Sequence, residues 1–147
     1  MNLKELLISH EGKRNEVYRC SAGHRTIGVG WNLDANPLPR DIQAYLDEHG
    51  CLNDACIDRL LDISIGWATK DCHDLFPDFD YFTANRQLAL IDFVFQLGRT
   101  KALRFSKSIA AINTGRWEDA ALNLSRSLWY EQVPNRAEEI CKLIEEG

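Results

Sequence analysis

Three residues near the N-terminus have types and spacing that suit glycosidic bond cleavage: Glu11, Cys20 and Thr26. Apolar residues recur every three or four positions before Glu11, which predicts a short helix over residues 2 to about 11. The negative end of a helix dipole favours the protonated form of a carboxyl, and a glycosidase needs a protonated carboxyl as general acid. A glutamate at a helix end is more commonly a solvated carboxylate, and Cys20 and Thr26 alone are an ordinary thiol and a strand hydroxyl. Spacing alone therefore leaves both interpretations open.

The segment from residue 14 to about 34 has a different character, because β-formers such as Tyr18 and Ile27 flank a turn signal at residues 21–23. We expect a small antiparallel hairpin or three-stranded sheet, with bends at Gly28 and Gly30 where a backbone or ligand comes close. Thr26 would lie on the second strand, where its side chain can face the same cleft as Glu11.

The rest of the chain is predicted to be helical. A brief helix over residues 40–48 ends at Gly50, and Asn53 caps a helix of more than twenty residues that ends before Pro77. At ~1.5 Å per residue this helix spans ~30 Å, so we expect it to join two lobes. The predicted fold is α+β and mainly α, in one domain of residues 1–147 with these parts: an N-terminal lobe with the sheet (about 12–52), a linking helix (about 53–76), and a C-terminal helical lobe (about 77–147) joined by helix 2–11.

Within the C-terminal lobe, residues 88–97 are apolar almost all round, which is typical of a central buried helix. Asp92 and Gln96 interrupt this segment and lie on one face. A further stripe runs from Trp117 to Leu128, and Pro134 precedes the last helix.

Composition excludes several classes of function. A formal charge of −5 argues against a nucleic-acid partner, and no apolar run approaches the ~18 residues of a membrane span. Glu5 interrupts the apolar stretch that a signal peptide would need, so we expect a cytoplasmic start. Five cysteines in a spacing unlike short zinc patterns indicate reduced thiols, with no metal and no cofactor.

Two blocks of the sequence resemble the phage-type lysozymes of glycoside hydrolase family 24. The first follows that family's pattern of a Glu, eight residues, an Asp or Cys, five residues and a Thr, here at Glu11, Cys20 and Thr26. The second resembles the C-terminal lobe of the family's T-even branch and comprises residues 89–98, 116–124 and 127–137.

The resemblance implies a role for each matching position. Glu11 would protonate the glycosidic oxygen, Thr26 would hold the attacking water, and Cys20 would orient that water and stabilise positive charge at the anomeric carbon. The implied substrate contacts are Phe95, Ser108 and Asn123, with Gln96 and Arg136 near the catalytic Glu, and Asn32 on the sheet. For Trp129, core packing and a place in the cleft are equally open.

The sequence departs from the family pattern in three ways. Cys20 is not a carboxylate, although a nearby Arg19 or Arg25 could favour its thiolate. Trp31 replaces a histidine, so an ion pair is lost. The net charge is acidic, whereas many lysozymes are basic and are attracted to the anionic wall.

The resemblance implies a monomeric endo-N-acetylmuramidase that hydrolyses β-1,4 bonds between N-acetylmuramic acid and N-acetylglucosamine in bacterial peptidoglycan. It also implies a role in phage or prophage lysis, with the enzyme held in the cytoplasm until a holin-type pore releases it to the periplasm. Two alternatives remain: a lytic transglycosylase, which needs no positioned water, and a non-catalytic cell-wall-binding protein.

Overall fold

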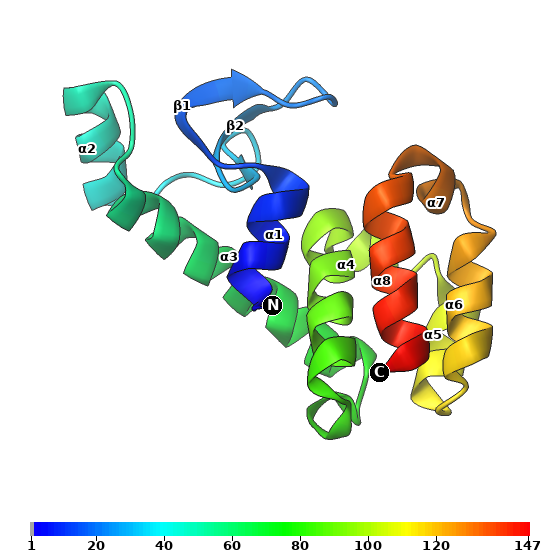
Figure 1. The fold of residues 1–147 in the computed structure, drawn as a ribbon. Coiled ribbons are helices and arrows are strands. Elements are labelled where there is room, and N and C mark those ends of the chain that lie inside the picture. The colour runs from blue at the N-terminus through cyan, green and yellow to red at the C-terminus, as the bar shows by residue number, and fades with distance from the viewer. Residues whose placement is uncertain (1) are drawn as a thin grey trace. The chain divides into compact units, whose positions relative to one another are not determined.

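The structure is a computed structural model and describes residues 2–147. Helices predominate, and one small sheet lies near the N-terminus, which confirms the predicted mainly helical α+β class (Figure 1). The elements in chain order are α1 (Leu3–Glu11), β1 (Arg14–Arg19), β2 (Arg25–Gly28), β3 (Trp31–Asn32), α2 (Arg40–His49), α3 (Asp54–Leu75), the 3-10 helix η1 (Phe79–Tyr81), α4 (Ala84–Ala102), α5 (Ser106–Asn113), α6 (Trp117–Ser125), α7 (Leu128–Gln132) and α8 (Pro134–Glu146).

Contacts between residues divide the chain into two compact units, residues 1–64 and residues 65–147. The boundary falls inside α3, the 22-residue helix that the sequence predicts. The lobe boundaries given above, and the assignment of helix 2–11 to the C-terminal lobe, stay predictions. Within residues 2–147 every helix is too short or too polar to cross a bilayer.

In the first unit, local capping fixes both ends of α1. Asn2 and Glu5 form a capping box, in which the Asn2 side chain accepts from the Glu5 amide at 2.8 Å. Gly12 ends the helix with φ of 79°, and its amide donates to the Ile8 carbonyl at 2.8 Å. Glu11 is therefore the last helical residue, as predicted.

The three strands pair antiparallel in the order β1-β2-β3. Tyr18 is paired with Thr26, and Thr26 is paired with Asn32, so these three residues form one row across the sheet. Directly paired residues carry their side chains on the same face of a sheet. The next pair along the strands is Ile27 and Trp31, whose side chains lie on the other face of the sheet, and both are buried.

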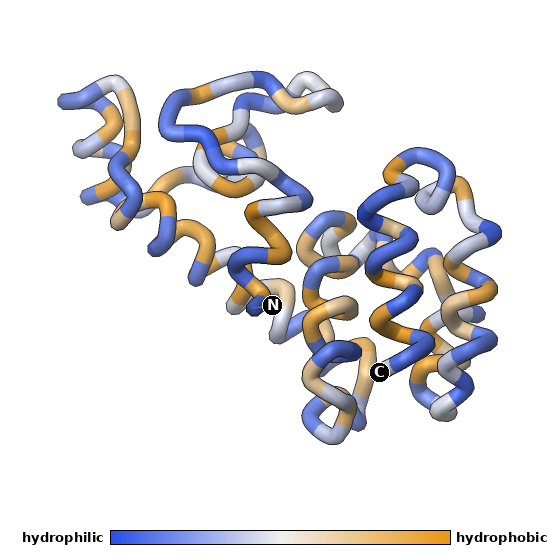
Figure 2. The backbone as a smooth tube through the Cα atoms, viewed as in Figure 1, coloured by the Kyte–Doolittle hydropathy of each residue, from blue (hydrophilic) through white to orange (hydrophobic). Residues whose placement is uncertain are grey.

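In the second unit, α8 shows the expected alternation of hydrophilic and hydrophobic residues along its length (Figure 2). Its buried side chains are Arg136, Ala137, Ile140, Cys141 and Ile144. Three aromatic rings pack edge to face, with centroids 5.0 Å apart for Phe93 and Trp129 and 5.1 Å apart for Phe93 and Phe105.

One detail of the helical prediction was wrong. Leu128 does not continue the α6 stripe: it begins α7 and is 66% exposed, because Ser127 starts a new helix by accepting from the Tyr130 amide. The apolar run of residues 88–97 lies within α4 and is largely buried, as predicted, and Gly98, which follows it, adopts φ of 75° and breaks the helix.

Candidate active site

The carboxyl of Glu11 lies against the backbone of Gly30. A Cβ built on Gly30 would be 2.9 Å from Oε2 of Glu11, closer than real Cβ atoms come, and 3.2 Å from its Cδ, so the carboxyl would have to shift. Gly30 has φ of 69° and lies in the turn between β2 and β3. The sequence predicted a close approach at this glycine, and the group that approaches is the candidate acid itself.

Cys20 lies in the turn after β1, and the backbone hydrogen bonds of Cys20 close this turn. Its amide donates to the His24 carbonyl at 3.0 Å, and the Gly23 amide donates to its carbonyl at 2.8 Å. The pKa of the Cys20 thiol is lowered mainly by the backbone amide of His24, with help from the amide of Ala22 and from Thr26, while partial burial opposes the shift.

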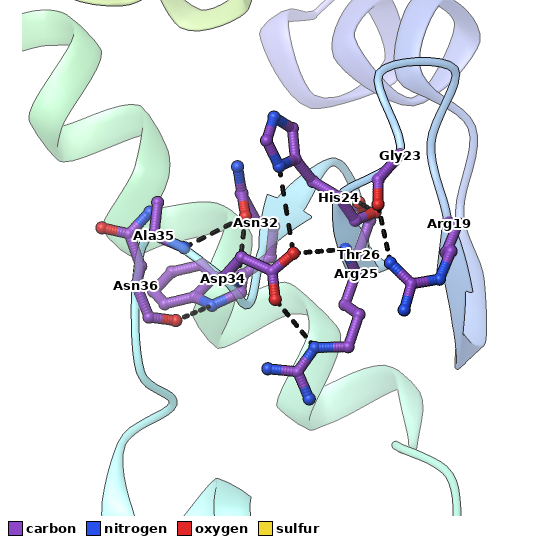
Figure 3. Close-up of polar contacts among 10 residues, drawn as sticks. Arg19, Gly23, His24, Arg25, Thr26, Asn32, Asp34, Ala35 and Asn36 are labelled. Atoms are coloured by element: carbon purple, nitrogen blue, oxygen red, sulfur yellow. Dashed lines mark hydrogen bonds and ion pairs between the residues drawn. The ribbon is translucent and has the colours of Figure 1, made fainter.

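The direction of this shift agrees with a thiolate role, but its expected source was wrong. The guanidinium of Arg19 donates to the Gly23 carbonyl at 2.8 Å, and that of Arg25 binds Asp34 at 2.7 Å (Figure 3). The turn amides, rather than either arginine, stabilise negative charge at the sulfur of Cys20.

Thr26 is buried in β2, with 3% of its surface exposed. Its hydroxyl donates to the His24 carbonyl at 2.9 Å (Figure 3). A hydroxyl has one proton and two lone pairs, so this bond leaves the oxygen as an acceptor. Any hydrogen bond from Thr26 to a Cys20 thiolate would require that proton to turn away from His24.

The side chain of Asn32 stabilises the loop that follows β3. Its side-chain oxygen accepts from the amides of Asp34 and Ala35, at 2.9 and 3.1 Å, and so holds the loop after β3 (Figure 3). Its side-chain amide nitrogen takes no part in these two bonds. Trp31, in place of the family's histidine, is buried and donates from its indole to the Asn36 carbonyl at 3.1 Å.

Tyr18 belongs to this group, although the sequence did not single it out as a site residue. Its ring lies under the guanidinium of Arg14, 4.7 Å from the ring centroid. Burial raises the pKa of the Tyr18 phenol, as do the charges of Glu11 and Cys20, whereas Arg14 lowers it. What links Tyr18 to the candidate site is its pairing with Thr26 across the sheet, and the sequence alone did not predict this register.

The second unit carries the other candidate residues. Arg136 of α8 forms a buried ion pair with Asp92 of α4, at 2.7 Å from Nε and 2.6 Å from Nη2. One turn along α4, Gln96 accepts from the indole of Trp129 at 2.9 Å. Asp92 and Gln96 therefore share a face, as predicted, and Trp129 is a buried core residue.

The remaining candidates lie on neighbouring helices of the same unit. Phe95 is half-buried on α4, Ser108 is buried on α5, and Asn123 is half-buried on α6. Helices α5 and α6 pack against each other. The structure thus groups Glu11, Cys20, Thr26 and Asn32 in the first unit and the other five in the second, and their roles stay predictions. No cluster of three or more ligating side chains that could hold a metal ion occurs among residues 2–147.

Comparison with known proteins decides the family. The sequence profile of the phage lysozymes matches residues 8–139, which is most of the chain. The chain belongs to the phage lysozyme family. It is therefore a lysozyme-type glycoside hydrolase whose substrate is bacterial peptidoglycan.

Relatives in this family are distant but collinear with the chain. Two proteins of Dictyostelium discoideum, probable T4-type lysozymes 2 and 1, are 26% and 24% identical over 99% of this chain and 95% of their own length. The pre-baseplate central spike protein Gp5 of Enterobacteria phage T4 is 27% identical over the whole chain, which spans 28% of that protein.

Proposed function

We propose that this lysozyme is an endo-acting N-acetylmuramidase that hydrolyses the β-1,4 bond between N-acetylmuramic acid and N-acetylglucosamine, with Glu11 as general acid. The observation that carries the proposal is the hydrogen bond from the Thr26 hydroxyl to the His24 carbonyl. Because this hydroxyl donates to the His24 carbonyl, its oxygen can accept a hydrogen bond from a water on the same side of the sheet. A water that donates to Thr26 directs its own lone pair away from the sheet, toward an electrophile.

Cys20 supplies the charge that the family places on a carboxylate. The turn amides favour its thiolate, and a negative sulfur beside the water stabilises the oxocarbenium-like transition state. In this scheme the thiolate also orients the water or accepts its proton. Water attack from the face opposite Glu11 inverts the anomeric carbon, so the first product is the α anomer.

The products separate hydrolysis from transglycosylation. Mass spectrometry of digested peptidoglycan should show reducing N-acetylmuramic acid ends, and proton NMR early in the digest should show the α anomer first. Ends of the 1,6-anhydro type, lighter by one water, would show that the enzyme is a lytic transglycosylase and not a hydrolase. A β anomer appearing first would make Cys20 or another group a covalent nucleophile. Binding to peptidoglycan without any cleavage would support the alternative of a non-catalytic cell-wall-binding protein.

We further propose a role in phage or prophage lysis, with the enzyme held in the cytoplasm until a pore releases it. The support is the family membership. Expression in Escherichia coli tests this role. Culture turbidity should fall only after chloroform or a co-expressed pore protein opens the inner membrane, and lysis without either would contradict the proposal.

A further inference from the structure

The peptide group between His24 and Arg25 is hydrogen-bonded at both of its ends (Figure 3). Its oxygen, the His24 carbonyl, accepts from the Thr26 hydroxyl at 2.9 Å and from the Cys20 amide at 3.0 Å. Its nitrogen, the Arg25 amide, donates to Oδ2 of Asp34 at 2.9 Å. Because a peptide group is planar and rigid, a carboxylate that fixes its N–H also fixes the direction of its C=O. Asp34 is therefore linked to the hydroxyl of Thr26 through a single peptide group.

The Asp34 carboxylate is bound by one residue through both of its oxygens. Oδ1 accepts from Nε of Arg25 at 2.7 Å, while Oδ2 accepts from the Arg25 amide. Nδ1 of His24 lies 3.9 Å from Oδ2, beyond hydrogen-bond distance. The loop around Asp34 has bonds of its own, since the Leu33 amide donates to the Arg25 carbonyl at 2.8 Å and the Asp34 amide donates to the Asn32 side chain at 2.9 Å. Removing the carboxylate therefore leaves the loop's own hydrogen bonds in place.

A charged acceptor at the N–H end of this peptide group strengthens the carbonyl at its other end. The bonds from the Arg25 side chain and amide lower the pKa of Asp34, so its carboxyl is ionised at neutral pH. Hydrogen bonds to an ionised acceptor are roughly twice as strong as neutral ones, and bonds in a chain polarise one another. The His24 oxygen thus becomes a better acceptor for the Thr26 proton, for which the sulfur of Cys20 is the competing acceptor. A proton held by the carbonyl leaves the threonine oxygen free to accept from water.

Resting on the proposed function, in which Thr26 holds the attacking water, we propose that Asp34 is a positioning residue of the hydrolysis. Its carboxylate fixes and polarises the peptide group between His24 and Arg25, and this peptide group holds the Thr26 proton away from the water. Asp34 acts through the peptide group and not on the sugar. The guanidinium of Arg25 has the lesser part, since it only steadies the carboxylate.

Two variants separate the backbone bond from the ion pair. Asp34→Ala removes both, whereas Arg25→Ala removes only the ion pair, because the backbone amide at position 25 remains to donate to Asp34. On soluble peptidoglycan strands, kcat should fall about 10-fold in Asp34→Ala, less than the ~100-fold cost of misplacing a reacting group by ~1 Å, while KM stays within about twofold. Arg25→Ala should keep kcat within about threefold of the wild type, since an exposed ion pair contributes little. Asp34→Asn, which keeps an oxygen acceptor without the charge, should lie between the wild type and Asp34→Ala. An unchanged kcat in Asp34→Ala, or an equal loss in Arg25→Ala, would overturn the proposal.

Amide hydrogen exchange tests the link without relying on activity. The Cys20 amide donates to the His24 carbonyl, so its exchange rate reports on that acceptor. In Asp34→Ala the Cys20 amide should exchange several-fold faster than in Arg25→Ala. The Leu52 amide, which is hydrogen-bonded elsewhere in the same unit, is the control for the fold and should keep its rate in both variants. Equal Cys20 rates in the two variants would overturn the proposal.

The products of the wild-type enzyme distinguish a failure of this inference from a failure of the proposed function. Reducing ends together with an unchanged kcat in Asp34→Ala would reject the role of Asp34 and keep the muramidase. Ends of the 1,6-anhydro type would reject the water attack itself, and with it the role of Asp34 in holding that water.

Discussion

Arg136 directs both Nε and Nη2 to the same carboxylate oxygen of Asp92, although the two residues are 44 positions apart. The Asp92 carboxylate is completely buried and the Arg136 side chain is 9% exposed. Removing one member of such a pair strands the other charge away from water.

Asp92→Leu should therefore lower the free energy of unfolding by about 3–5 kcal/mol. The double variant Asp92→Leu/Arg136→Met should recover most of that loss, since an apolar pair of similar volume replaces a buried ion pair at little cost. Urea denaturation measures both. The control is Asp74→Ala, which breaks the exposed pair with Arg99 and should cost less than about 1 kcal/mol. Equal losses in Asp92→Leu and Asp74→Ala would contradict the assignment.

Glu11→Gln should abolish lysis while the fold persists. The amide fills the same volume against Gly30 but has no acidic proton for the leaving oxygen. We expect a loss of at least ~100-fold in turbidity assays on chloroform-treated Gram-negative cells, with an unchanged circular dichroism spectrum. Near wild-type clearing by this variant would remove Glu11 from the acid role.

Gly30→Ala should reduce activity through displacement of the Glu11 carboxyl. Its Cβ would meet Oε2 at 2.9 Å, and a misplacement of ~1 Å in a reacting group costs up to ~100-fold. Gly50→Ala is a matched control, since Gly50 has a similar φ of 72° and no heavy atom within 4 Å of the added Cβ. Both variants should lose stability from backbone strain, but only Gly30→Ala should lose most of its kcat.

The thiols should react with iodoacetamide in an order set by their pKa values. Cys20, whose pKa is lowered, should be alkylated first. Burial raises the pKa of Cys141 to about 11 and that of Cys72 to about 12, so these two should react last. Peptide mass spectrometry over a time course gives the order. Faster labelling of Cys72 than of Cys20 would contradict the structure.

Substitution then tests whether the Cys20 thiol assists the water. Cys20→Ala should lower kcat strongly, and Cys20→Asp should keep much of the activity because it restores a negative group in the same turn. Substitution is the cleaner test, because an alkyl adduct could block substrate by its bulk alone. Full activity in Cys20→Ala would make the residue a packing group and leave Thr26 as the water ligand.

His73 should make a small pH-dependent contribution to stability. Its hydrogen bond to Asp80 at 2.7 Å raises its pKa above the ordinary 6.5. The stabilisation is therefore fully present below pH ~6.5 and is lost as pH rises through the folded pKa. Because both groups are exposed, we expect less than about 1 kcal/mol. Urea midpoints at pH 5.5 and 8.5 should differ less in Asp80→Asn than in the wild type, and equal differences would contradict this.

Local signals in the sequence predicted the elements well. Gly12, Gly50 and Asn53 mark helix ends by their own backbone or side-chain chemistry, and the structure uses all three as predicted. Leu128 shows where such signals mislead. It lies four residues after Leu124 and so appears to continue the stripe of α6, but Ser127 between them caps the next helix, α7.

The site was harder to predict because its contacts join distant segments. Glu11 meets Gly30 across nineteen positions of sequence, and the pairing of Tyr18 with Thr26 depends on the strand register, which shifts between Arg14 and Tyr18. Residue types alone could not distinguish turn amides from arginines as the groups that favour the Cys20 thiolate.

The five thiols give this protein an uneven sensitivity to oxidants. All five are free, so the fold gains nothing from an oxidising compartment and loses nothing in a reducing one. Cys72 and Cys141 stay protonated and buried at physiological pH, which protects the interior from peroxide and from disulfide exchange. Cys20 is only half-buried and the pKa of its thiol is lowered, so in the proposed mechanism oxidation of Cys20 would stop catalysis while the molecule remained folded.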